Sequence, residues 1–167
     1  KEYNDVSEIV LLNHGIEDRH LLEQKLLKIY QDYENARNNY DKNALKKICT
    51  EKQYNETISN IDIYKEVNQR KYNIINEIID VKIVDVSDSL ISTTITLLIK
   101  VSMNSYIEDS IGKVVRGKKN RKIIKKQRLK FVKKLTKNTI VTNRKCDSCG
   151  APIKENDLEC SYCGLST

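Results

Sequence analysis

Two Cys-x-x-Cys-Gly motifs stand close together near the end of the sequence. Cys146 and Cys149 form the first pair, and Cys160 and Cys163 form the second, with ten residues between the pairs. Zinc prefers four soft ligands in a tetrahedron, and two such turns supply four thiolates. Two disulfides or a redox Cys-x-x-Cys would use the same residues, but the duplicated pair at this spacing favours zinc. The sequence therefore predicts one structural Zn²⁺ bound by Cys146, Cys149, Cys160 and Cys163.

The residues around the motifs agree with a structural role for this metal. Gly150 and Gly164 follow the two pairs, where a tight turn often needs a positive φ. Residues 145–167 contain few apolar side chains, so the metal would supply most of their folding free energy. Four thiolates leave no open position for a catalytic water. Thiolates also stay available for zinc in a reducing cytosol, which argues against a secreted protein.

The rest of the sequence shows no pattern typical of a catalytic site. Cys49, the fifth cysteine, lies beside Leu45 and Ile48 on an apolar helical face and is interpreted as a small core residue. His14 and His20 have no acid–base partner nearby in the sequence. There is no nucleophile elbow and no phosphate-binding loop. We therefore predict that the chain is not an enzyme.

The net charge of +7 is distributed unevenly along the chain. Residues 113–145 hold 15 of the 30 Lys and Arg and no Asp or Glu, so the remainder carries about −8. Such a basic strip can bind an anionic membrane, where each cation contributes about 1 kcal/mol, or nucleic-acid phosphates, or can be merely a solvated strand face. The predicted anionic-surface residues are Lys118, Lys119, Arg121, Lys122, Lys125, Lys126, Arg128, Lys130, Lys133 and Lys134.

Helical patterns occupy the first part of the chain. Residues 1–17 predict a short helix that Gly15 ends, or a linker. Asp18 can cap a long helix, and Asp41 can cap a shorter one. The apolar stripe of the long helix comprises Leu22, Leu26, Ile29, Tyr30, Tyr33, Ala36 and Tyr40. A third helical stretch carries Tyr54, Ile58, Ile61, Tyr64 and Val67 on one face.

Strand patterns follow from about Asn73 onward. Residues Ile75, Ile79, Val81 and Ile83 alternate with polar residues, and Ser87-Asp88-Ser89 is the predicted turn. Alternate apolar residues from Ile91 to Met103 predict a strand with one wet face. A further strand contains Leu129, Phe131 and Leu135, and Thr139-Ile140-Val141 is a short last run.

This order of elements predicts an α+β fold with helices packed on a curved antiparallel sheet. The 167 residues suffice for one domain of ordinary size plus a small zinc ribbon. The predicted divisions are residues 1–17, residues 18–143 and the ribbon at 144–167. No stretch approaches the 18 apolar residues of a membrane span. The chain begins at Lys1 rather than Met, so we expect a fragment or a processed form.

Between about Asp18 and Val141 the chain resembles the Tim44-like domain family. The resemblance rests on a long first helix followed by Asp41-Lys-Asn-Ala-Leu45-Lys-Lys-Ile48, on Asn73-Ile-Ile-Asn-Glu-Ile-Ile-Asp-Val81, and on the loop from Ser105-Tyr106-Ile-Glu-Asp109 to Gly112. The Cys-x-x-Cys-Gly pairs are similar to the zinc ribbon of some bacterial members. The resemblance implies a fold of the type also seen in nuclear-transport-factor-2-like (NTF2-like) and cystatin-like domains.

The resemblance also implies a function. Mitochondrial members are peripheral inner-membrane components of the protein import motor, and bacterial members are labelled transport proteins with membrane-spanning segments upstream. We therefore expect a transport-related binding or scaffold module at the cytoplasmic face of a membrane, anchored by a segment upstream of this fragment. Its partner would be an anionic membrane surface or a protein. The alternative is a nucleic-acid-binding protein that uses the basic strip 113–145 and the zinc ribbon.

The concave sheet face is a further predicted feature. Ile95, Leu97, Ile99 and Leu129 line it in the predicted fold. A face of this kind is able to hold an apolar peptide or lipid, but its residues favour a face that the long helix covers.

Overall fold

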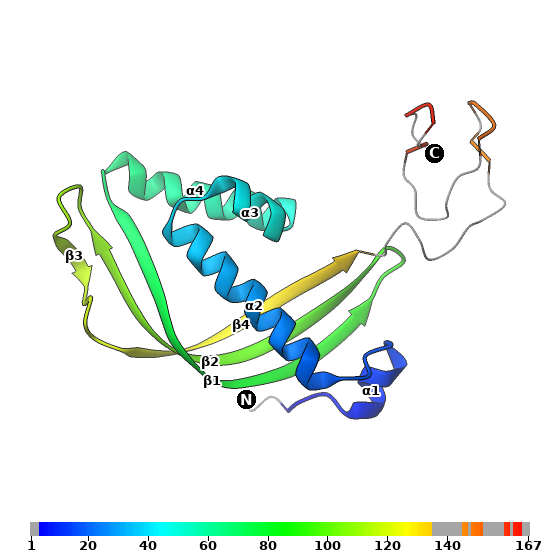
Figure 1. Ribbon diagram of the computed structural model, residues 1–167, viewed down its shortest axis with the longest axis horizontal. Coiled ribbons are helices and arrows are strands. Elements are labelled where there is room, and N and C mark those ends of the chain that lie inside the picture. Colours follow the sequence, from blue (N-terminus) through cyan, green and yellow to red (C-terminus); the bar gives the residue numbers. More distant parts are fainter. Residues whose placement is uncertain (1–3, 135–144, 147, 152–158, 161, 165–167) are drawn as a thin grey trace. The chain divides into compact units, whose positions relative to one another are not determined.

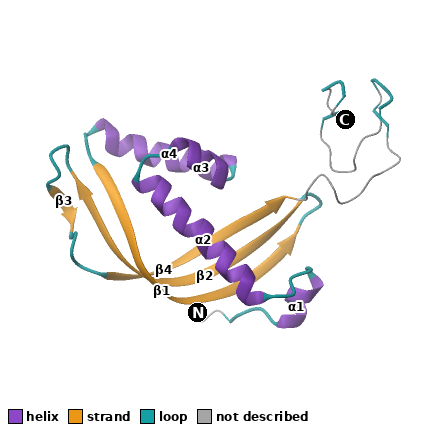
Figure 2. Cartoon of the chain, viewed as in Figure 1, coloured by secondary structure: helices purple, strands orange, loops and turns teal. Residues whose placement is uncertain are grey.

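The computed structural model contains four helices and four strands among the residues that it describes, which are 4–134, 145–146, 148–151, 159–160 and 162–164 (Figures 1 and 2). The elements are α1 (Glu8–Asn13), α2 (Arg19–Asn38), α3 (Lys42–Ile48), α4 (Glu51–Glu66), β1 (Arg70–Asp88), β2 (Ser92–Glu108), β3 (Val114–Gly117) and β4 (Ile123–Lys134). The predicted α+β class with an antiparallel sheet is confirmed. Backbone packing divides the chain into two units, Lys1–Val86 with Ile95–Phe131, and Ser87–Thr94 with Val132–Thr167.

Each helix begins at a side-chain cap. The N-cap residues are Ser7, Asp18, Asp41 and Thr50. Their oxygens accept hydrogen bonds of 3.0–3.3 Å from the backbone N–H three residues later. Such caps satisfy amide groups that have no partner inside the helix. The helix starts predicted at Asp18 and Asp41 are therefore confirmed.

Strand β2 is the centre of the sheet. β1 pairs with one side of β2, while β3 and β4 both pair with β2 on the other side. β3 pairs with the last residues of β2 in an antiparallel register, with Tyr106 opposite Gly117 and Ile107 opposite Arg116. β4 is consequently an edge strand.

Helix α2 crosses one face of the curved sheet (Figure 1). Leu26 and Tyr30 of α2 pack on this inner face together with Leu11 of α1. The sheet's contribution to this core consists of Ile83, Val86, Ile95, Leu97, Ile99, Val101 and Met103. Burial of such side chains stabilises by about 1.5–3 kcal/mol each. A second cluster of Ala36, Leu45 and Ile61 joins α2, α3 and α4.

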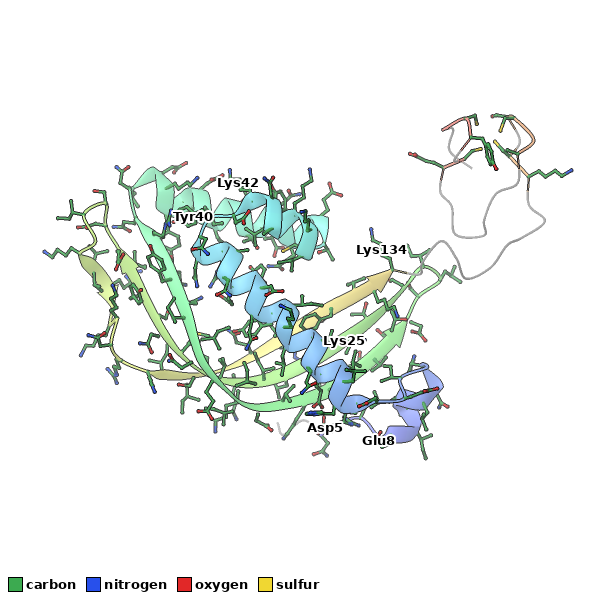
Figure 3. All side chains as sticks on the ribbon, in the orientation of Figure 1. Asp5, Glu8, Lys25, Tyr40, Lys42 and Lys134 are labelled. Carbon is green, nitrogen blue, oxygen red and sulfur yellow. The ribbon has the colours of Figure 1, made fainter. Side chains whose placement is uncertain are left out.

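The segment before α2 is held by one arginine and by the edge of β1. Arg19 forms ion pairs with Asp5 (3.1 Å) and Glu8 (2.8 Å), two residues that lie near the start of α2 (Figure 3). The Val6 N–H donates to the Ile83 carbonyl (2.8 Å), and the Ile83 N–H donates to Asp5 Oδ1 (2.8 Å). These bonds occupy part of the outer edge of β1.

The alternation predicted for β1 is wrong at one position. Ile79 is 42% exposed, and Ile78 packs on the core instead. The core-facing positions are Ile75, Ile78, Val81, Ile83 and Val86. Their spacing includes steps of three residues. A strictly two-residue pattern therefore fails along this long strand.

Other predicted positions also differ. Ile29 of α2 and Val67 after α4 are 40% and 59% exposed, so neither is a core residue. Thr96 and Ser102, predicted on a wet face of β2, are 2% and 8% exposed because β2 has strands on both sides. Ile91, predicted to begin the apolar face of this strand, is 55% exposed.

The turn before β2 lies later than predicted. β1 continues through Asp88, and the Ser89 N–H donates to the Ser92 carbonyl (2.8 Å). Leu135, Thr139-Ile140-Val141 and the boundary predicted between residues 143 and 144 lie outside the described residues. Within the part of the chain that the structure describes, none of the helices has both the length and the apolar content of a bilayer span.

Candidate metal centre and basic surfaces

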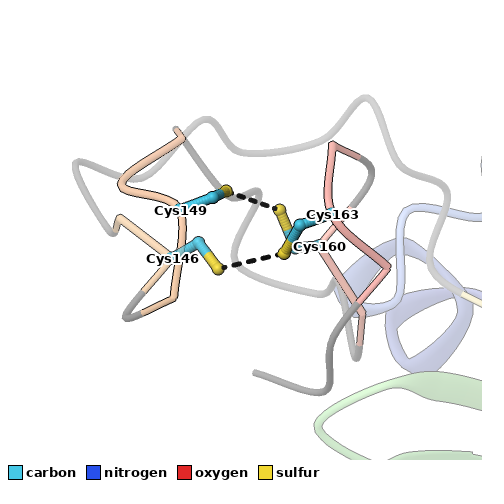
Figure 4. A group of neighbouring side chains, drawn as sticks. All are labelled: Cys146, Cys149, Cys160 and Cys163. Carbon is cyan, nitrogen blue, oxygen red and sulfur yellow. Dashed lines mark hydrogen bonds between the residues drawn. The ribbon is translucent and has the colours of Figure 1, made fainter.

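The four cysteines of the two motifs converge on one point. Their Sγ atoms all lie within 4.8 Å of one another. Cys146 and Cys163 are 3.7 Å apart, and Cys149 and Cys160 are 3.6 Å apart, so each contact joins one motif to the other (Figure 4). A disulfide has an S–S bond of about 2.05 Å. None of these cysteines is in a disulfide, and the cluster can hold a metal ion.

The two motifs have the same local backbone. The Gly150 N–H donates to the Cys146 carbonyl (2.8 Å), and the Gly164 N–H donates to the Cys160 carbonyl (2.7 Å). Gly150 and Gly164 have φ values of +73° and +75°, as the sequence predicts. Cys146 and Cys160, the first residue of each motif, are buried, whereas Cys149 and Cys163 are exposed. The repeated turn delivers its two thiols in the same way from each half.

The electrostatics of the cluster favour thiolate at the first cysteine of each motif. Backbone N–H donors of Cys163 and Tyr162 lower the pKa of Cys160 to about 7. Donors at Cys149 and Ser148 likewise lower the pKa of Cys146. For Cys149 the Ala151 N–H lowers the pKa, but partial loss of hydration and the hydrogen bonds with the neighbouring thiols outweigh it and raise the value to about 12. Metal binding requires the thiolate form, so the backbone already prepares half of the ligand set.

The sulfur positions fit a tetrahedral ion. A metal–sulfur bond of about 2.3 Å in a regular tetrahedron places sulfur atoms about 3.8 Å apart. The two sulfur–sulfur contacts of 3.6 and 3.7 Å are close to this edge length. With four thiolates as ligands, no coordination position is left for a water or a substrate. The arrangement can hold a metal ion.

Cys49 is not one of the four clustered cysteines. It follows the last residue of α3 and packs, half-buried, against the cluster that joins α2, α3 and α4. Burial raises the pKa of its thiol. A thiol with a raised pKa is a poor nucleophile, which agrees with the predicted packing role.

The ten predicted anionic-surface residues differ in their surroundings. Lys119 forms an ion pair with Glu108 (3.3 Å), and Lys118 and Arg121 line a cavity. Lys125 is half-buried on the side of β4 that also carries Gln127, to which Tyr30 of α2 donates a hydrogen bond (2.6 Å). All of the ten except Lys125 are exposed, including Lys122, Lys126, Arg128, Lys130, Lys133 and Lys134.

Alternation along β4 creates a basic row. Lys126, Arg128 and Lys130 are exposed, whereas the residues between them are half-buried. Successive side chains on one side of a strand are about 7 Å apart. The half-buried side of β4 faces α2. Lys126, Arg128 and Lys130 therefore project together to the side of the strand away from the helix. We call Lys126, Arg128 and Lys130 the β4 row.

Sequence reasoning missed two cations of the cavity that Lys118 and Arg121 line. Lys71 on β1 and Arg116 on β3 line the same cavity. Lys71 lies outside the basic strip, and only the fold brings it near residues 116–121. The sequence indicated this cavity only weakly, through Gly117 between the two cations Arg116 and Lys118.

The concave-face residues Ile95, Leu97 and Ile99 are at most 6% exposed and pack in the core that α2 covers. Leu129 is half-buried against the same core. The inner face at this place is therefore filled by the protein's own helix.

Comparison with known proteins adds no assignment to these sites. The Tim44-like resemblance stays a prediction, and the roles of the sites rest on their geometry. Neither the models of known protein families nor the curated proteins include a match to this chain.

Proposed function

We propose that this protein is a non-enzymatic binding module that attaches to the anionic cytoplasmic face of a membrane through the β4 row. The observation that carries the proposal is the exposure of Lys126, Arg128 and Lys130 on one side of an edge strand. Three cations on the same side of one strand can contact a charged surface together. Lys122, Lys133 and Lys134, exposed on the flanks, extend the basic region.

The number of cations determines the binding free energy of this attachment. Each Lys or Arg near an anionic leaflet contributes about 1 kcal/mol, so three to six cations give about 3–6 kcal/mol. The attraction falls off within a Debye length of about 8 Å at physiological salt. Binding of this kind is reversible and salt-sensitive, and suits a module that a second contact also anchors.

We further propose that the cysteine cluster holds one zinc ion. Tetrahedral thiolate sites suit zinc, and also iron, and neither a redox partner nor an open ligand position accompanies this site among the described residues. The ion would supply folding free energy to the short segment that carries the motifs. This segment is a zinc ribbon in the proposal, and its role is to stabilise the chain's last residues or to contact a protein.

The proposed family is the Tim44-like one, with an NTF2-like or cystatin-like sheet and a transport-related role. The order of helices before strands, the caps at Asp18 and Asp41, and the path of α2 across a curved antiparallel sheet support it. In this proposal the membrane contact of the module serves to place a protein partner near the bilayer.

Co-sedimentation with vesicles tests the membrane contact. The full chain is mixed with phosphatidylcholine vesicles, with or without 30 mol % phosphatidylglycerol (about the anionic content at which polybasic segments bind), over a salt series. A K126E/K130E variant reverses two charges of the β4 row. A matched K25E/K52E variant reverses two exposed charges on α2 and α4.

Selective binding to the anionic vesicles that K126E/K130E loses and K25E/K52E keeps is the expected result. Equal loss in both variants would mean that net charge, rather than the β4 row, drives the contact. Tighter binding to a single-stranded or duplex oligonucleotide, with a steep salt dependence, would favour the nucleic-acid alternative. Binding to neither would leave the row as a solvated face.

A further inference from the structure

A cavity of about 480 Å³ lies where β3 meets the end of β2. Its walls come from α4, from all four strands and from the loop between β3 and β4. Small-molecule sites in proteins commonly measure about 300–1,000 Å³. The cavity is therefore large enough to hold a ligand of a few to about a dozen heavy atoms.

Four cations line this cavity. They are Lys71 of β1, Arg116 of β3, and Lys118 and Arg121 of the following loop. No Asp or Glu is among the lining residues. In the described part of the chain, none of these four side chains takes part in an ion pair, whereas the adjacent Lys119 is paired with Glu108. A concave site lined by one sign of charge concentrates counter-ions of the opposite sign.

The backbone brings two of these cations together. Gly117, between Arg116 and Lys118, has φ +74°, and a Cβ added there would lie 2.4 Å from the Ser105 carbonyl oxygen. Only glycine permits this approach, which holds β3 directly against β2 and places its neighbours at the cavity. The cavity is thus built by a specific backbone contact.

Lys71 provides the deepest charge. It is half-buried, and burial lowers its pKa, as do the charges of Arg37 and Lys125, which together outweigh the opposite effect of Glu34. Holding an ammonium group in this place is unfavourable unless an anion offsets the repulsion.

The cavity also offers neutral polar and aromatic groups. Ser105 lines it, and its hydroxyl is hydrogen-bonded to the Asn73 side chain (2.7 Å). Tyr64 of α4 contributes an aromatic wall. A hydroxyl held in place can donate to or accept from a ligand, and an aromatic ring can cover a ligand's uncharged part.

We propose that this cavity binds a phosphate group in its dianionic form, carried by a small phosphomonoester or by a lipid with a phosphomonoester headgroup. Four cations lining one cavity exceed what a monoanionic carboxylate needs, and match the two negative charges and three acceptor oxygens of a phosphomonoester. Arginine suits these oxygens because its planar fork donates two parallel hydrogen bonds. The site is separate from the β4 row and stands whether or not the row binds membranes.

The test is a titration of the zinc-loaded full chain with glycerol 3-phosphate, followed by calorimetry and by amide NMR shifts. The variant R116Q/R121Q removes two exposed charges of the cavity, so folding is preserved, which far-UV circular dichroism checks. The matched control K126Q/K130Q removes two charges of the β4 row. We expect saturable one-to-one binding that R116Q/R121Q weakens at least about tenfold and the control leaves within about twofold. Binding should also weaken below about pH 6, where the phosphate becomes monoanionic.

A second arm distinguishes the two sources of the phosphate. Vesicles that contain phosphatidic acid are compared with phosphatidylglycerol vesicles of equal surface charge. A preference for phosphatidic acid that R116Q/R121Q abolishes assigns a lipid headgroup, and glycerol 3-phosphate binding without this preference assigns a free molecule. Lack of binding in both arms, binding that R116Q/R121Q leaves unchanged, or tighter binding of a single-stranded oligonucleotide through the same arginines overturns the proposal. The membrane contact of the β4 row is measured separately, as the binding of K126E/K130E and K126Q/K130Q to phosphatidylglycerol vesicles.

Discussion

The side chain of Asn38, the last residue of α2, forms two hydrogen bonds with the backbone of Asn73 on β1. Its side-chain amide donates to the Asn73 carbonyl (2.8 Å), and its side-chain oxygen accepts from the Asn73 N–H (2.9 Å). Both residues are buried. The Asn73 side chain in turn bonds the Ser105 hydroxyl of β2 (2.7 Å). These two side-chain amides therefore fix the end of the long helix to strands β1 and β2, directly beside the phosphate cavity proposed above.

Replacing Asn38 by Ala should lower the free energy of unfolding by about 2–4 kcal/mol, because a buried N–H and a buried carbonyl lose their partner together. Urea denaturation measures the change. The matched control is Asn35→Ala, an exposed asparagine on the same helix, which should stay within about 0.5 kcal/mol of the wild type. Equal effects at the two positions would show that the Asn38–Asn73 pair adds no stability.

Gly117→Ala should destabilise the protein by about 3 kcal/mol, since a methyl group would strike the Ser105 carbonyl and the residue would keep a positive φ. Gly112→Ala is the matched control. Gly112 also has a positive φ, of +84°, but an added Cβ would have no atom within 4 Å, so only about 1 kcal/mol should be lost. Similar losses at both glycines, measured by denaturation, would contradict the tight approach of β3 to β2.

Lys71→Gln should raise the stability of the protein near neutral pH. The folded state lowers the pKa of Lys71, so the unfolded chain binds this proton more tightly, and the protonated group opposes folding. This penalty is fully present below the folded pKa and fades as the pH rises through it toward the usual value of 10.5. The stability difference between variant and wild type should therefore shrink in alkaline solution.

Thermal melts of both proteins between pH 7 and pH 10.5 measure this effect, with exposed Lys52→Gln as the control. A destabilising Lys71→Gln would mean that Lys71 has a stabilising partner in the free protein. Loss of glycerol 3-phosphate affinity together with a gain in stability would identify Lys71 as a residue kept for binding.

Cys160→Ser should remove the bound metal. The wild-type chain is expected to carry one zinc per molecule by elemental analysis, and the variant about none, because three thiolates hold a structural ion much more weakly than four. Cys49→Ser is the control and should keep its zinc. The helical circular dichroism signal should stay unchanged in Cys160→Ser, since Cys160 is not part of the cores formed by the helices and sheet. Iron in place of zinc would leave the cluster as a metal site but overturn the zinc assignment.

The features that local chemistry determines could be predicted from the sequence. A cap such as Asp18 acts within three residues, and each Cys-x-x-Cys-Gly turn closes on itself with a glycine at positive φ. The position of Ile79 could not be predicted in the same way. A bend in a long strand depends on how the whole sheet curves around α2, and no local pattern in β1 records it.

The basic strip shows the same limit. Fifteen cations in sequence order suggest one surface, yet the fold divides them among an ion pair at Lys119, a cavity at Lys118 and Arg121, and the exposed β4 row. Lys125 and Lys126 lie on opposite sides of β4 because side chains alternate along a strand. The sequence does not tell which of the two faces the core. The addition of Lys71 to the cavity depends on the pairing of β1 with β2, a long-range contact.

The two edges of the sheet differ in what hinders their pairing with a second copy of the protein. On the β1 edge, Asp5 and Val6 already occupy the Ile83 backbone. On the opposite edge, no strand among the described residues pairs with the far side of β4. Like charges at Lys126, Arg128 and Lys130 would repel a second copy of β4, as lysines do on many exposed strands. The chain should thus resist edge-to-edge stacking into aggregates at low salt, and an anionic polymer that neutralises β4 should remove that protection.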